Sequence, residues 1–234
     1  MTVNTLLQDL FPAGHDVTSS KGLLLGFART AQGDIAVLGT TNHLALDSTT
    51  ALELAAFVLK IVRENPGCPI LMLVDTQGQR LSKTEELLGI NGYLAHLVKC
   101  LDLARRQDHR LLTLIYNEAV SGGFLSFGLM ADEIHALKEA RVRVMNLPAM
   151  AKITKLPLEM LESLSNDSPW FAPGVENFYL LGGIHSVWSG DLSEQLQEAL
   201  IRQNDTDCRR QEGMDRQGRK LALPVAHDIS NSEM

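Results

Sequence analysis

A serine followed by two glycines, Ser121-Gly122-Gly123, stands shortly after an apolar run at residues 111–116. The run predicts a buried strand, and the small residues predict a turn into a helix. Adjacent glycines leave the backbone bare, so a ligand oxygen can come close to exposed N–H groups. Backbone N–H groups aimed at one oxygen stabilise the negative charge that develops on it during acyl chemistry. This stretch therefore predicts an oxyanion site built from main-chain atoms.

A second turn, at residues 75–79 (Asp-Thr-Gln-Gly-Gln), follows another apolar run at residues 69–74. If the two strands are neighbours in a parallel sheet, both turns lie at its carboxyl edge, where ligands bind in open α/β sheets. Each turn could then aim one N–H at the same oxygen, such as that of a thioester enolate. One such donor is typically worth about 3 kcal/mol in the transition state. The alternative is that Gly78, Gly122 and Gly123 only permit tight turns or close helix packing.

The polar side chains of the two turns have competing interpretations. A serine between a strand and a helix is typical of the nucleophile of hydrolases, but that pattern needs glycine where Ala119 stands. Capping of the helix start is the favoured role of Ser121. Asp75 and Glu118 could act as acid or base, or could accept hydrogen bonds from nearby backbone. His185 is expected to be structural.

The remaining pattern alternates apolar runs with helical spacing. Residues 22–27 and 34–38 predict a hairpin, and residues 133–137 and 141–146 predict two further strands. Helices are expected at residues 49–64, 94–104, 124–130, 155–164 and 191–201, with Thr49 or Thr50 capping the first. Alternating strands and helices with buried strands indicate α/β layers joined by right-handed crossovers.

Composition narrows the class of protein. The 234 residues carry a formal net charge of −7, with no basic block in the first 200 residues, which argues against a nucleic-acid surface. No apolar run reaches the roughly 18 residues needed to cross a bilayer. Cys68, Cys100 and Cys208 are too widely spaced to indicate a disulfide framework or a metal site, and no secretory signal is recognised. We expect a cytoplasmic protein with one domain at residues 1–204 and a polar tail at 205–234, either mobile or docking a partner.

Three segments together resemble a known superfamily. Residues 74–78 (Val-Asp-Thr-Gln-Gly), 121–123 (Ser-Gly-Gly) and 131–137 (Ala-Asp-Glu-Ile-His-Ala-Leu) resemble the crotonase superfamily, and within it the carboxyltransferase subunits. The chain as a whole resembles the gamma subunits of biotin-independent malonate decarboxylases over roughly residues 20–200, and residues 117–189 carry the best-matching segment. This resemblance implies a crotonase-like ββα spiral of the carboxyltransferase C-half type.

The resemblance also implies an activity and a set of partners. Subunits of this family act with a homologous beta subunit, and the substrate is a malonyl thioester on the phosphopantetheine-type group of a small acyl carrier subunit. Decarboxylation gives the acetyl thioester and carbon dioxide, and a separate alpha subunit exchanges acetyl for malonyl. No cofactor or metal is expected on this chain itself. By position, the oxyanion site matches Gly78, Gly122 and Gly123, with substrate-binding roles for Gln77, Gln79 and Ser121.

Two other functions remain open from the sequence. The first is a stand-alone crotonase-type hydratase or isomerase acting on an acyl-CoA, for which Asp75 and Glu118 are the local carboxylates. The second is a non-catalytic scaffold subunit that binds a partner and the carrier.

Overall fold

The computed structural model describes residues 1–145, 147–167, 174–202, 206–218 and 222–232. Its strands are β1 (Thr18–Ser20), β2 (Leu23–Thr30), β3 (Gly33–Thr40), β4 (Ala45–Leu46), β5 (Ile70–Thr76), β6 (Gly78–Gln79), β7 (Leu111–Val120), β8 (Glu133–Leu137), β9 (Arg141–Arg143) and β10 (Ser186–Trp188). Its helices are α1 (Val3–Leu10), α2 (Ser48–Glu64), α3 (Lys83–Leu88), α4 (Ile90–Arg106), α5 (Ser121–Ser126), the 3-10 helix η1 (Gly128–Met130), α6 (Leu147–Thr154), α7 (Leu158–Asp167), α8 (Val175–Leu180), α9 (Leu192–Ile201), α10 (Arg209–Asp215) and α11 (Ala222–Ser232).

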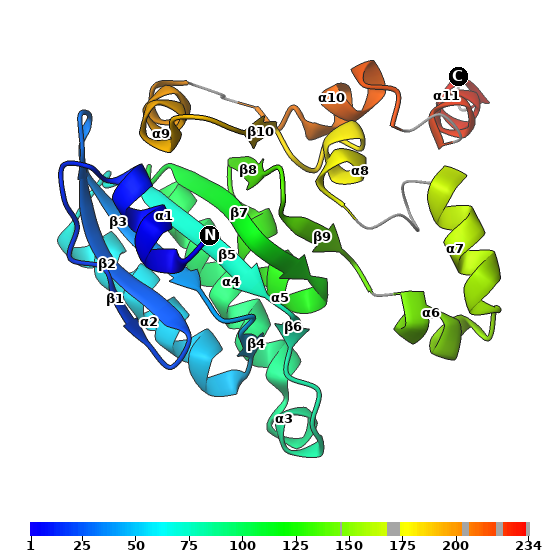
Figure 1. Cartoon of the computed structure of the whole chain (residues 1–234), viewed down its shortest axis with the longest axis horizontal. Coiled ribbons are helices and arrows are strands. Elements are labelled where there is room, and N and C mark those ends of the chain that lie inside the picture. Colours follow the sequence, from blue (N-terminus) through cyan, green and yellow to red (C-terminus); the bar gives the residue numbers. More distant parts are fainter. Residues whose placement is uncertain (146, 168–173, 203–205, 219–221, 233–234) are drawn as a thin grey trace.

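One twisted sheet organises the chain, in the order β1-β2-β3-β5-β7-β8-β10, with β9 also paired to β7. The predicted hairpin is confirmed, because β2 and β3 pair antiparallel from Leu23↔Thr40 to Thr30↔Gly33. From β3 onward the neighbouring strands run parallel. A separate parallel pair, β4 and β6, stands off the carboxyl end of the main sheet (Figure 1).

Both faces of the sheet are covered, and this explains the uninterrupted apolar runs. On β5 every residue from Ile70 to Thr76 is buried. Alternate side chains pack on one face with α2, α4 and α5, and on the other face with α1 and α9 (Figure 1). A parallel strand covered on both faces reads as a continuous apolar run rather than an alternating one. The predicted α/β layering is therefore confirmed.

Several local boundaries differ from the sequence prediction, among them those of α2, β7 and α5. The N-cap of α2 is Asp47, whose carboxylate accepts the Thr50 N–H at 2.9 Å while the Thr50 hydroxyl accepts the Asp47 N–H; the expected Thr49 or Thr50 cap is therefore wrong. Strand β7 continues to Val120, so no turn separates it from α5. The helix expected at 124–130 is divided into α5 and η1.

Part of the predicted tail packs on the domain. The Arg216 guanidinium donates to the carbonyl oxygens of Tyr179 and Ile184, each at 2.8 Å, and lies 3.8 Å from the Tyr179 ring centroid. A Cβ on Gly182 would overlap the carbonyl oxygen of Arg209, so α10 rests directly on that glycine. Residues 205, 219–221 and 233–234 of the tail lie outside the described residues, and the boundary at 204 stays a prediction. Among the described helices, none is both long and apolar enough to cross a bilayer.

Replacement of Gly182 by alanine should weaken the packing of α10 on the domain. Gly182 and Gly190 share nearly the same left-handed φ, +81° and +84°, but a Cβ on Gly190 meets nothing within 4 Å. Both alanine variants therefore carry the same backbone strain, and only Gly182→Ala pushes on Arg209. A loss of about 1.4 kcal/mol would make amide hydrogen exchange over residues 209–215 roughly ten-fold faster in Gly182→Ala alone. Equal exchange in the two variants would show that α10 does not depend on this contact.

Candidate active site

The carboxyl ends of β5 and β7 meet at one edge of the sheet. The two strands pair parallel from Ile70↔Leu111, and after a register shift Thr76 lies opposite Ala119. The sequence prediction required these strands to be neighbours, and this requirement is met. The turn that contains Gly78 and the start of α5 therefore face one another.

The three predicted glycines lie where the start of α5 approaches the Gly78 turn, and we call this close approach the glycine contact. A Cβ on Gly123 would lie 2.9 Å from the Gly78 Cα and 2.8 Å from its carbonyl carbon, closer than real Cβ atoms approach backbone. Gly78 itself adopts φ +105°, a conformation that side-chain-bearing residues rarely adopt. A Cβ on Gly122 would lie 2.9 Å from the Gln79 Oε1. The structure therefore brings together all three residues of the predicted oxyanion site, plus Gln79.

The N–H groups of the three glycines differ in whether they already have a hydrogen-bond acceptor. Gly78 donates its N–H to the Thr76 Oγ1 at 3.0 Å, and Gly122 donates its N–H to the Gln79 Oε1 at 3.1 Å. The Gly123 N–H has no acceptor among the described residues. An amide oxygen thus already sits against Gly122, where a carbonyl oxygen of a ligand could bind once the Gln79 side chain moved aside.

The other predicted site residues lie around this contact. Gln77 is exposed between β5 and β6, and Ser121 is half-buried at the first position of α5. The favoured capping role of Ser121 is wrong, because the N-cap is Val120 and no side chain caps this helix start. Ser121 instead has φ +50°, in the left-handed region. Within the described part of the chain, no histidine contacts its hydroxyl group, so the geometry offers no base to activate it.

A cluster of charged side chains lies at the carboxyl ends of β5 and β7. We call it the His43 cluster; its members are His43, Asp75, Glu118, Arg141 and Arg143. His43 Nδ1 is 3.1 Å from Asp75 Oδ1 and 3.3 Å from Glu118 Oε2. Glu118 Oε1 is 3.0 Å from Arg141 Nη2 and 3.3 Å from Arg143 Nη2. The Asp75 carboxylate also accepts two backbone N–H groups, that of His43 at 3.0 Å and that of Glu118 at 3.3 Å.

Sequence reasoning named the two carboxylates of this cluster and missed its cations. A signal for the arginines existed, because residues 141 and 143 alternate along a strand and so lie on one face. The involvement of His43 had no local signal, since the loop that carries it meets β5 and β7 only in the folded chain.

Other ionisable groups lie away from the glycine contact. The His185 Nδ1 accepts the Ile134 N–H at 3.0 Å, and burial lowers the pKa of this histidine, as befits a structural role. Its ring and the side chains of Cys208 and Glu212 bring three possible metal ligands within 4.8 Å of one another. Glu212 is, however, already paired with Arg216 at 3.0 Å.

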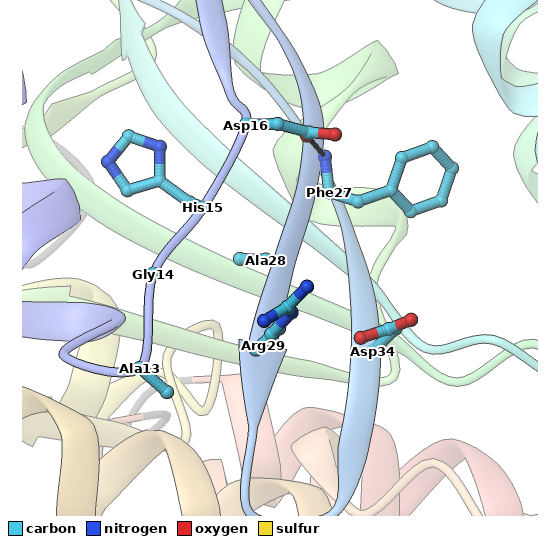
Figure 2. Close-up of a pocket in the computed structure, with 8 residues that line it drawn as sticks. All are labelled: Ala13, Gly14, His15, Asp16, Phe27, Ala28, Arg29 and Asp34. Atoms are coloured by element: carbon cyan, nitrogen blue, oxygen red, sulfur yellow. Dashed lines mark hydrogen bonds between the residues drawn. The ribbon is translucent and has the colours of Figure 1, made fainter.

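A surface pocket of about 390 Å³ lies between the turn at residues 13–16 and strands β2 and β3 (Figure 2). Its lining includes Arg29 and Asp34, and Asp16 Oδ1 accepts the Phe27 N–H at 2.5 Å. Residues 28–34 adjoin the start of β3, which lies beside the amino end of β5 at Ala36↔Ile70. The pocket is thus at the opposite end of the sheet from the glycine contact.

Comparison with known proteins decides the family. The sequence profile of the malonate decarboxylase gamma subunit matches residues 41–233, a span that includes Gly78, Gly122 and Gly123. The chain belongs to this family. A curated relative, the malonyl-S-ACP:biotin-protein carboxyltransferase of Malonomonas rubra, is 40% identical over 122 residues, which make up 51% of this chain and 42% of that protein.

Solved structures confirm the fold of this family member. The Pseudomonas malonate decarboxylase hetero-tetramer in complex with coenzyme A contains a chain that superposes with a TM-score of 0.79 at 25% identity, over 96% of this chain and 97% of that one. The Pseudomonas malonate decarboxylase hetero-dimer gives 0.74 at 25% identity, with 98% of both chains covered. Transcarboxylase 12S, at 20% identity and 0.72 over 87% of this chain and 42% of that one, shares the fold. The predicted crotonase-like carboxyltransferase fold is confirmed.

The close contact at Gly123 should be sensitive to a single methyl group. Gly123→Ala forces the Cβ against the Gly78 backbone, and overpacking of this kind costs about 1–3 kcal/mol of unfolding free energy. Gly92→Ala, on the exposed face of α4, meets nothing within 4 Å and should be neutral or slightly stabilising. Urea denaturation of the two variants measures the difference. Equal stabilities would mean that α5 does not rest on Gly78.

Proposed function

We propose that this chain is the gamma subunit of a malonate decarboxylase that acts with a homologous beta subunit. The pair would decarboxylate a malonyl thioester held on an acyl carrier subunit, giving the acetyl thioester and carbon dioxide. The observation that carries the proposal is the family match over residues 41–233. The relative named for malonyl-S-ACP supports the substrate class, and the hetero-dimer and hetero-tetramer of Pseudomonas support the partner subunit.

The chemistry suits the glycine contact. When the carboxylate leaves as carbon dioxide, the electron pair of the broken C–C bond passes into the thioester, and its oxygen gains charge. The N–H groups of Gly122 and Gly123 would donate to that oxygen, and the close approach of Gly123 to the Gly78 backbone would hold the helix start in place. Protonation of the enolate carbon then completes the acetyl group. Donors fixed in place before the reaction stabilise such charge without reorganising.

A thioester held on an acyl carrier subunit also matches the hydrogen-bond donor at Gly122. The Gly122 N–H holds the Gln79 amide oxygen at 3.1 Å, so a thioester carbonyl oxygen matches the same donor. In this proposal the substrate carbonyl oxygen replaces the Gln79 side chain at the Gly122 N–H. Gln77 and Ser121 contact the substrate beside it. The chain binds no cofactor of its own, because the phosphopantetheine-type group arrives on the carrier and presents the malonyl group. An alpha subunit would reload the carrier, and the complex would be cytoplasmic.

The stand-alone hydratase is less well supported. Such an enzyme needs a carboxylate free to activate water, whereas Asp75 and Glu118 are both engaged within the His43 cluster. No observation in the described residues favours this second activity. The scaffold alternative is separated from the decarboxylase by an assay of the isolated subunits.

The defining experiment is reconstitution from separate subunits. We expect release of carbon dioxide from a malonyl carrier thioester by the mixture of gamma and beta subunits, and by neither subunit alone. Enoyl-CoA hydration by this chain alone would contradict the proposal. Full decarboxylation by the beta subunit alone would reduce this chain to a scaffold.

The role of the main chain can be isolated at Gly123. Gly123→Ala and Gly123→Pro both add atoms beside Gly78, but only proline removes the N–H. If that N–H stabilises the enolate, the reconstituted rate with Gly123→Pro should fall about 10²–10³-fold below that with Gly123→Ala. Size-exclusion chromatography establishes that both variants still bind the beta subunit. Equal rates in two assembled variants would rule out this donor.

A further inference from the structure

We propose that His43 is the acid that protonates the enolate carbon, with its imidazolium form held by Asp75 and Glu118. This inference rests on the proposed function, because decarboxylation leaves a carbanion-like carbon that must gain one proton to become a methyl group. Four features of the described residues support it.

The first feature is the orientation of the ring. His43 Nδ1 is shielded from solvent and faces two carboxylate oxygens, Asp75 Oδ1 at 3.1 Å and Glu118 Oε2 at 3.3 Å. Neither contact has hydrogen-bond angles, so the attraction is mainly one of charge. The side chain is nevertheless 45% exposed, and because Nδ1 is shielded, the exposed surface lies elsewhere on the side chain. A carboxylate-backed imidazole that solvent can reach is the arrangement typical of histidines that transfer protons.

The second feature is the backbone that carries the ring. Asn42 and His43 adopt φ +58° and +51°, two consecutive left-handed residues that are not glycine. The His43 N–H donates to Asp75 Oδ2 at 3.0 Å, and the Thr76 hydroxyl donates to the next carbonyl, Leu44, at 2.6 Å. Strand β5 thus fixes the loop at two points.

The third feature is the charge balance around the ring. The carboxylates of Asp75 and Glu118 are matched by the guanidinium groups of Arg141 and Arg143, which reach Glu118 from β9. Tyr116, which also lies near Asp75, donates its hydroxyl to the Thr40 carbonyl at 2.9 Å, and burial raises its pKa. Among the residue types of the cluster, histidine is the one suited to passing a proton in neutral solution, so the imidazole is the member assigned to proton transfer.

The fourth feature is the distance to the glycine contact. Ala45, two residues after His43, pairs in register with Gly78. Asp75 and Glu118 stand three residues before Gly78 and Ser121 respectively, a span of at most about 10 Å of chain. The cluster and the proposed oxyanion donors therefore belong to the same few turns at the end of the sheet.

The proton balance is simple. Loss of carbon dioxide takes no proton and leaves the electron pair in the enolate. A new C–H bond then forms to the methylene carbon with the proton from His43 Nε2, and the imidazolium becomes a neutral imidazole. Solvent returns one proton to the ring before the next turnover. Because the protonated ring donates the proton in this proposal, the rate should fall at alkaline pH.

The test uses the reconstituted gamma–beta complex and two reactions. One is decarboxylation of the malonyl carrier thioester; the other is deuterium exchange into the methyl group of the acetyl carrier thioester in D₂O, which reverses the protonation step. We expect His43→Gln to slow methyl exchange by about 10²–10⁴-fold and to abolish the alkaline limb of the pH–rate profile. His15→Gln, an exposed histidine outside the cluster, should behave as the unmodified complex does.

A second variant leaves the histidine in place. Glu118→Gln removes one carboxylate beside the ring and leaves Arg141 and Arg143 unmatched, so the imidazolium is less favoured. The alkaline limb should then move to lower pH, because a carboxylate no longer favours the protonated ring. This readout also separates proton transfer from a merely structural role, which would lower the rate at every pH alike.

The outcomes are distinct. An assembled His43→Gln complex with unchanged methyl exchange, or a Glu118→Gln complex with an unmoved alkaline limb, would overturn the assignment of His43. Should His43→Gln fail to assemble, the Glu118→Gln profile decides. An unmodified complex without decarboxylation would instead overturn the proposed function itself, and with it the role of His43.

Discussion

The close approach of α5 to the Gly78 turn is the contact on which the candidate site depends. Parallel pairing of β5 and β7 brings two strand ends together, but side chains at 78 or 123 would hold the two backbones apart. Without a Cβ at either position, main-chain N–H groups from the helix start lie next to the second turn. The fold gains no favourable side-chain contact from these glycines. Their benefit is access to the backbone, which suits a site that must bind an oxygen.

The His43 cluster complements this contact in chemical character. Main-chain donors at Gly122 and Gly123 carry no titratable group, so they can stabilise charge but cannot supply a proton. The cluster contains an imidazole that is backed by carboxylates and balanced by arginines on β9. The segment at residues 43–46 links the cluster to the glycine contact, because it carries His43 and its strand β4 pairs with β6, which contains Gly78. Charge stabilisation and proton transfer are thereby assigned to separate parts of one sheet edge.

The fold and the glycine site could be predicted because both rest on local patterns. Continuous apolar runs marked β5 and β7, and small residues after them marked the turns. Predictions failed where two local solutions compete. Asp47, rather than one of the threonines that follow it, is the N-cap of α2. Pairing with β9 extends β7 through Val120. His43 was missed for a different reason: its partners lie 32 and 75 residues away in sequence, and only tertiary structure brings them together.

The most direct test of the oxyanion site is a crystal structure of the gamma–beta complex with a stable analogue of a malonyl thioester. We expect the analogue's carbonyl oxygen about 2.7–3.1 Å from the N–H nitrogens of Gly122 and Gly123, with the Gln79 side chain displaced from its present hydrogen bond. An analogue bound elsewhere in the complex, with Gln79 still on the Gly122 N–H, would contradict the role of this glycine contact.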